Sequence, residues 1–424
     1  MTVKAGSIVT VAGHTVVQRL QTQGLTNAKI PINTIYEIGN NGVVDKVPQE
    51  PDFTFTLESF AVDSSIEAIL HGRVSSGPLA SQGAGQADPV GTEYKWAESQ
   101  QVNICSPWKD PQSFSSGNVV AGHLLPGYFP QKLSYKFGVT EDSAVTAELR
   151  GGTFFYGAFA PTEDVIVGSG GTQGYVTSEP AVEFRRGGVL GTTFKSALGV
   201  LVNGVWKVEG EDYTATGGGP AGSATAVTVT FTNYTVVNGD QIRIAYYTTN
   251  THSYPDTVQE SSLVLPGAVR GRNVCLSVAS GGSDVWQRVY GVQTLTLDAS
   301  FNITPERELC NDELVGFTIN STDCTGAVTL HAKDIQAFFT FLKQMTGLDT
   351  TQEVVGWLNL NPLKIKIEIQ DPRNPGSVLK TLYVSDAIFD IPATPAKANA
   401  VVDFPLTWES LNGTYSAFKG AAAI

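Results

Sequence analysis

An internal repeat sets the strongest limit on how this chain folds. Gly6–Leu20 (GSIVTVAGHTVVQRL) and Gly271–Val289 (GRNVCLSVASGGSDVWQRV) both read as a short alternating strand, a glycine-containing turn and then Gln-Arg. Downstream, Phe53–Ser59 and Ala327–Asp334 are alternating strands that run into helical segments. Strand, turn and helix markers keep one order over two long segments, which predicts two copies of one structural unit.

Each copy carries one helical segment. Asp63–Gly72 has a capping residue at its start and a glycine at its end, which predicts a short helix. Lys333–Gly347 places apolar residues at three- and four-residue steps, which predicts a helix with one apolar face against a sheet. After the helices both copies reach an Asp-Pro pair, ending at Pro111 and Pro372, and then close with long strands.

A third segment separates the copies. Residues 180–255 alternate polar and apolar side chains, with Asn-Gly turn signals at Asn203 and Asn238. This pattern predicts a small β-sandwich module, either Ig-like or hairpin-like, and the Gly/Ser-rich stretch Val167–Gly174 predicts a flexible join. We therefore expect a mainly β chain in three parts, with residues 1–165 as the first copy, 166–265 as the inserted module and 266–424 as the second copy.

The composition favours a structural role over a chemical one. Apolar residues are 42% and charged residues 16%, which is typical of a well-buried globular protein. The net charge is −13 with no basic block, so tight binding of nucleic acid is not expected. The histidines and cysteines show no metal-site or catalytic spacing, so the sequence predicts no catalytic residue, cofactor or metal site, and no enzyme. No apolar stretch approaches the roughly 18–20 residues of a membrane span, so no membrane partner is expected.

The order of these elements resembles that of bacteriophage tail tube proteins. The resemblance rests on the strand-to-helix step in Phe53–Gly72 and Ala327–Gly347, and on the closing strands in Leu133–Gly152 and Val401–Gly420. It implies that each copy is a tail-tube-like β-sandwich or barrel domain with one flanking α-helix. In that family six such domains close a ring, and rings stack into the tail. Members usually carry one tube domain per chain, so two copies imply that three chains form a pseudo-sixfold ring.

The resemblance also implies partners and a location. It describes a virion protein made in the cytoplasm of the host bacterium, which assembles with itself and with tape measure, tail tip and terminator proteins. DNA would pass through the lumen without specific binding, so the lumen should be acidic. The candidate lumen-facing residues are Glu37, Asp298, Glu306, Glu308 and Asp403. The long loop Val74–Glu98 ends in YKWAE, and the candidates for a contact between rings are Tyr94 and Trp96.

Two other functions stay open. Another phage structural protein, such as a capsid decoration or baseplate component, would share the β modules without needing the repeated order. A secreted carbohydrate-binding or hydrolytic β-sandwich would carry a signal peptide and exposed aromatic residues beside a carboxylate pair. No signal peptide is expected in Met1–Gly13, which has no apolar run of the required length.

Overall fold

The described part of the chain forms antiparallel β-sheets with one short α-helix, which confirms the mainly β class. Side chains alternate between buried and half-buried along most strands, as period-two patterning requires. The computed structural model describes residues 11–12, 15–17, 20–26, 32–36, 43–48, 52–60, 62–71, 77–78, 88–109, 119–171, 173–184, 195–196, 198–219, 222–249, 269–282, 284–308, 314–331, 361–374, 376–390, 403–422 and 424.

In the N-terminal part of the chain, which we call the first repeat, two sheets share one long strand. The sheet β3–β6–β11–β10 lies against a second sheet in which β9 pairs with β1 and β10, and β10 pairs with β12. Strand β10 serves both sheets because its ladder is interrupted between Leu125 and Tyr128, where Gly127 has a φ of 65°. The elements are β1 (Val11–Ala12), β2 (Thr15–Val16), β3 (Leu20–Thr26), β6 (Phe53–Ser59), α1 (Ser65–Leu70), β9 (Val102–Lys109), β10 (Val119–Gly138), β11 (Ala144–Gly151) and β12 (Phe155–Gly157).

The C-terminal part, which we call the second repeat, has the same pairing scheme. Strands β24–β25–β28–β27 form one sheet; in the other, β22 pairs with β23 and β26, and β27 pairs with β26 and β29. Irregularities also correspond, since the break between Leu20 and Thr22 of β3 matches that between Val292 and Thr294 of β24. The elements are β22 (Val274–Ser280), β23 (Gln287–Val289), β24 (Val292–Arg307), β25 (Leu314–His331), β26 (Leu363–Gln370), β27 (Val378–Asp390), β28 (Asp403–Ser410) and β29 (Ser416–Lys419).

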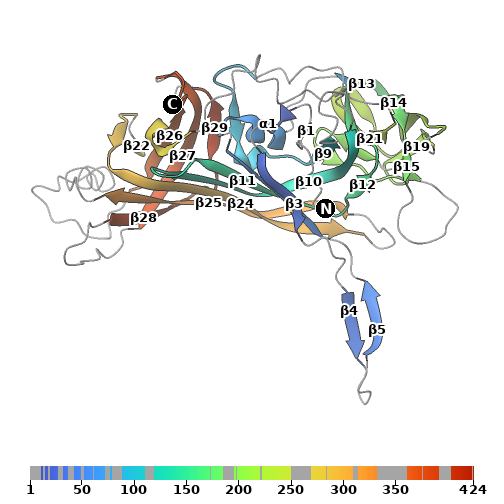
Figure 1. The fold of residues 1–424 in the computed structure, drawn as a ribbon, viewed down its shortest axis with the longest axis horizontal. Helices are drawn as coiled ribbons and strands as arrows, with labels where there is room; N and C mark the ends of the chain where they lie inside the picture. The colour runs from blue at the N-terminus through green and yellow to red at the C-terminus, as the bar shows by residue number, and fades with distance from the viewer. Residues whose placement is uncertain are drawn as a thin grey trace, which may run out of the picture.

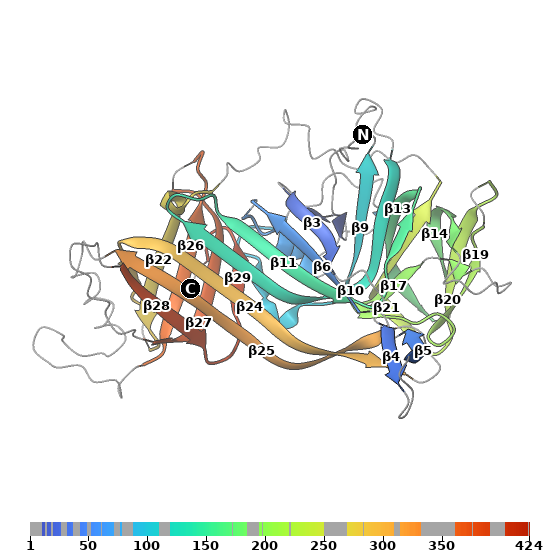
Figure 2. The same ribbon diagram turned by 60° about the horizontal axis from the view of Figure 1, so that its bottom comes forward.

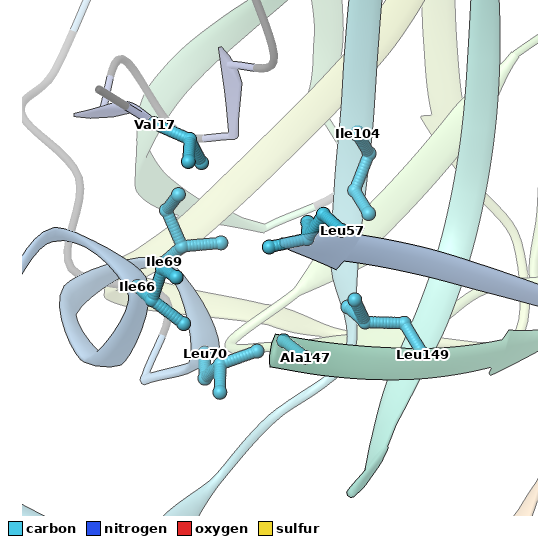
Figure 3. A pocket seen from close by; sticks show the side chains of 8 residues that line it. All are labelled: Val17, Leu57, Ile66, Ile69, Leu70, Ile104, Ala147 and Leu149. Carbon is cyan, nitrogen blue, oxygen red and sulfur yellow. The ribbon is translucent and has the colours of Figure 1, made fainter. Parts of the chain in front are cut away.

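The helix α1 closes the apolar interior of the first repeat. It begins beside Asp63, whose carboxylate accepts a hydrogen bond from the backbone N–H of Ser65 at 3.1 Å. Its apolar side chains face the inner sides of β6, β11 and β9, as Figure 3 shows. The helix predicted at Lys333–Gly347 lies outside the described residues. The residues of this contact are Val17, Leu57, Ile66, Ile69, Leu70, Ile104, Ala147 and Leu149.

The inserted module has its own core and leans on the first repeat. Its core is separate from the cluster that both repeats share. Tyr247 donates to the carbonyl oxygens of Gly122 and Phe155, each at 2.9 Å, so the module is also hydrogen-bonded to β10 and β12. The stretch Val167–Gly174 runs through the end of β13 into β14. The strands are β13 (Ala160–Gly171), β14 (Gly174–Ala181), β17 (Gly199–Val202), β18 (Val205–Trp206), β19 (Tyr213–Gly217), β20 (Thr225–Phe231) and β21 (Val236–Thr248).

The long axis of the molecule runs from the second repeat, through the first, to the module (Figure 1). The hairpin of β4 (Ile32–Tyr36) and β5 (Val43–Pro48) projects from this body, whereas β24 and β25 run beneath β10 toward the module (Figure 2). At the Asn-Gly turn between β17 and β18, Asn203 and Gly204 have φ angles of 51° and 75°, which confirms the predicted hairpin turn.

Candidate assembly surfaces

The two repeats meet through one continuous sheet. Lys132–Gly138 of β10 pairs antiparallel with Thr294–Ser300 of β24, which joins the sheets into β3–β6–β11–β10–β24–β25–β28–β27. On the opposite side of the interior, β8 (Glu93–Lys95) pairs with β29. The counterpart of β10 in the second repeat is β27, not β24. The repeats therefore contact each other through two different surfaces, which is a head-to-tail contact.

Aromatic side chains fill this junction. Trp96, in the 3₁₀ turn η2 (Trp96–Glu98), stacks on Phe301 at 4.5 Å and on Tyr415 at 6.0 Å between ring centroids. From the sequence, Tyr94 and Trp96 are expected at a contact between rings. The structure instead places both, each 1% exposed, inside the junction, because pairing of β8 with β29 turns them inward. Both side chains are covered by this chain itself and are not exposed for a contact with another copy.

A buried ion pair also joins the repeats. Lys380 of β27 forms an ion pair with Glu67 of α1, and the two side chains are 0% and 1% exposed. The Lys380 ammonium further donates to the Tyr135 hydroxyl at 2.7 Å and to the Asp63 carbonyl at 3.0 Å. Burial raises the pKa of the Glu67 carboxyl and lowers the pKa of Lys380, while their mutual attraction opposes both shifts. Each charge therefore depends on the other repeat for its partner.

The outer face of the joined sheet is mostly polar, with Ala144, Ala327, Ile388 and Pro405 among the polar side chains. The cross-strand registers place the polar side chains of this face, which are named at the end of this paragraph, on the side of the sheet opposite to the core. Asp298 accepts a hydrogen bond from Ser134 and lies 3.9 Å from Lys132, and His331 contacts Asp403 at 3.0 Å. Carboxylates outnumber cations here. The face comprises Thr54, Thr56, Glu58, Lys132, Ser134, Lys136, Thr146, Glu148, Arg150, Thr294, Thr296, Asp298, Ser300, Asp323, Thr325, Thr329, His331, Asp403, Thr407 and Glu409.

The acidic residues predicted to line a lumen fall in different places. Asp298 and Asp403 lie on this polar face. Glu306 lies on the same side of β24, close to the end of the β24–β25 hairpin. Its carboxylate accepts a hydrogen bond from the Thr318 hydroxyl. Glu308 is exposed directly after β24 ends, and Glu37 lies outside the described residues. A shallow hollow on the face is bordered by three carboxylates, those of Asp298, Asp390 and Glu409.

Within the ranges that the structure describes, no three His, Cys, Asp or Glu side chains gather closely enough to hold a metal ion. The same residues include no helix with the length and hydropathy of a membrane span. Comparisons of the sequence with models of known protein families and with curated proteins found no match.

Proposed function

We propose that this chain is a structural protein that assembles with further copies of itself into stacked rings, which form the tail tube of a bacteriophage. The observation that carries the proposal is the head-to-tail contact between two repeats with the same strand pairing. The resemblance of the strand-to-helix and closing-strand segments to tail tube proteins supplies the kind of assembly.

A head-to-tail contact between like units does not end with two of them. In the described part of the chain, β24 pairs with both β10 and β25, whereas its counterpart β3 pairs with β6. The first repeat thus presents, on β3, the edge that the second repeat uses on β24 against it. In the second repeat, the counterpart of the β10 edge begins at Asp390, the last residue of β27, and continues outside the described residues. Repeating such a contact closes a ring or builds a helix, and ring closure pairs every sheet edge. Three chains would supply the six positions that the resemblance implies.

The polar face gives such a ring a channel wall suited to DNA. Threonine and serine side chains cover much of it and its carboxylates outnumber its three cations, Lys132, Lys136 and Arg150, so phosphates would meet weak repulsion instead of tight binding. DNA would therefore pass without being held. Tape measure, tail tip and terminator proteins are the further partners that a tail tube needs.

The test is negative-stain electron microscopy of the purified full chain, with its solution mass measured over a range of concentrations. Hollow tubes, or three-chain rings with a sixfold-looking outline, are the expected result. A chain that stays monomeric at every concentration would overturn the proposal, because the head-to-tail surfaces would then have no partner.

A further inference from the structure

We infer that the buried pair Lys380–Glu67 determines which repeat follows which in the assembly. The inference rests on the proposed function, since it concerns the junctions between copies. Glu67 belongs to the first repeat and Lys380 to the second. The groups that receive the Lys380 ammonium, the Tyr135 hydroxyl and the Asp63 carbonyl, also belong to the first repeat. The charge pair thus forms where the α1 side of a first repeat meets the β27 side of a second repeat.

The first repeat has a neutral residue where the second has Lys380. Lys380 pairs with Ile369 directly after an irregularity in the β26–β27 ladder, and Ala121 pairs with Trp108 directly after the corresponding irregularity between β9 and β10. Ala121 is therefore the counterpart of Lys380. In sequence alone, Glu67 also has a neutral counterpart, because SIEAIL at Ser65–Leu70 aligns with DIQAFF, which has glutamine at that place. A junction from a second repeat to a first repeat would contain neither charge.

Junctions in the wrong order would bury one charge alone. In the closed chain, α1 and the β10 edge of the first repeat are covered by the second repeat of the same chain, so a junction in the wrong order requires that internal junction to open. If the opened first repeat then docked onto the first repeat of another chain, Glu67 would lie opposite Ala121 and lose its ammonium partner. If a second repeat docked onto a second repeat, Lys380 would lose its carboxylate. Burial of a lone charge is far less favourable than burial of a bonded pair or of neutral groups. The pair therefore selects alternation of first and second repeats.

A pair of cysteines can report the wrong order. Lys136 of β10 lies opposite Thr296 of β24 in the same chain, and Gly24 of β3 is the counterpart of Thr296. Residue 136 therefore faces residue 24 of another chain only in a first-to-first junction. Antiparallel partners are close enough for a disulfide, and a Cβ at Gly24 meets nothing within 4 Å. The reporter is the full chain with Gly24→Cys and Lys136→Cys, assembled, oxidised and examined on non-reducing gels.

Two single variants break the pair with different expected results. Glu67→Gln removes the lone carboxylate from a first-to-first junction but leaves Lys380 unpaired in the normal one. We expect several-fold more interchain disulfide than in the reporter parent. Lys380→Met breaks the same pair but leaves Glu67 buried alone in both kinds of junction, so the interchain disulfide should rise clearly less than in Glu67→Gln. Equal yields in the two variants would overturn the inference, because general destabilisation affects both alike.

The double variant Glu67→Gln/Lys380→Met makes the internal junction neutral and covers the case in which a single variant does not fold. It should fold, assemble and exceed the parent in interchain disulfide; a parental yield, or failure to fold, contradicts the inference. The pair Lys136→Cys/Thr296→Cys, which should cross-link within one chain, is the control for oxidation. A parent that never assembles would refute the proposed function itself, whereas an assembling parent with unresponsive variants would refute only the ordering role.

Discussion

At the residue scale, a second buried ion pair lies inside the inserted module, and an amide of the first repeat is hydrogen-bonded to it. Arg243 of β21 binds the Glu163 carboxylate of β13 at 2.9 Å, and both side chains are 1% exposed. Asn103 of β9 donates to the same carboxylate at 2.9 Å and to the Gly199 carbonyl at 3.1 Å. The Asn103 amide thus links β9 of the first repeat to β13 and β17 of the module. One of its two acceptors is the Glu163 carboxylate, whose charge Arg243 neutralises.

Replacing Arg243 by methionine should strongly destabilise the protein. Glu163 would remain buried without its cation, which costs about 3–5 kcal/mol in other proteins. The measurement is the urea midpoint of unfolding, followed by fluorescence. Lys95→Met is the matched control, since Lys95 and Glu98 form an exposed pair, and it should leave the midpoint unchanged. Similar midpoints for both variants would show that the buried pair has no special role.

The protein should also lose stability on mild acidification through His123. This side chain lies 5.3 Å from Tyr156 between ring centroids, and burial lowers its pKa from the ordinary 6.5. The unfolded chain therefore binds a proton at His123 more readily than the folded chain does. The contribution of neutral His123 to folding stability is present above pH 6.5 and is lost as the pH falls below that value. The temperature of half-unfolding should decrease when the pH is lowered from about 7.5 to about 5.5, and His123→Gln should make that decrease smaller.

At the scale of elements, the two repeats fill equivalent core positions with different volumes. Leu149 of β11 lies opposite Phe55 of β6, and the corresponding pair in the second repeat is Trp408 opposite Gly326. A phenylalanine and a leucine in the first repeat correspond to a glycine and a tryptophan in the second, while the ladders keep their register. Strand pairing can therefore repeat even where residue identity and side-chain volume do not, because backbone hydrogen bonds define the ladder.

Gly326→Ala should destabilise the second repeat. An added Cβ would lie 2.2 Å from the Trp408 ring and 2.4 Å from the Thr296 carbonyl oxygen, so strand or ring must shift. The expected loss is about 1–3 kcal/mol in urea unfolding. Gly24→Ala, at a strand glycine with open space around it, is the control and should cause little change. No difference between the two would mean that β25 and β28 can separate freely here.

Local patterns in the sequence predicted what local physics determines. The mainly β class, the start of a helix directly after Asp63 and Ser64, and the turn at Asn203 follow from alternation, side-chain acceptors and backbone preference within a few residues. Tyr94 and Trp96 did not follow, because their burial depends on pairing with β29, more than 300 residues away. Lys380 and Glu67 were missed for the same reason. The available signal for the buried pair was Lys380 itself, a lysine at an inward-facing position of β27, which pairs with β26 and β29.

At the scale of the whole molecule, the polar sheet face should accept charge changes that alter transport without altering the fold. Thr325 and Glu409 face each other across β25 and β28 and are exposed. Thr325→Lys/Glu409→Lys should make assembled tubes retain DNA in a salt-dependent manner, since lysines bind phosphates. Filter binding with labelled DNA measures this. The same number of lysines on the module, at Val176 and Val205, should cause no retention, and retention there would place DNA outside the channel.

The inserted module reaches across to the second repeat. Trp206 lies over Gly127, where a Cβ would be 2.5 Å from the indole, and its cluster also receives Val315 from β25. This contact between the module's Trp206 and β10 has no counterpart among the described residues of the second repeat. A ring of three chains would place six repeats around the channel but only three inserted modules on the outer surface. If the proposed ring forms, a doubled chain would therefore let every second position on its outer surface carry an additional domain while the strand pairing around the ring stays the same.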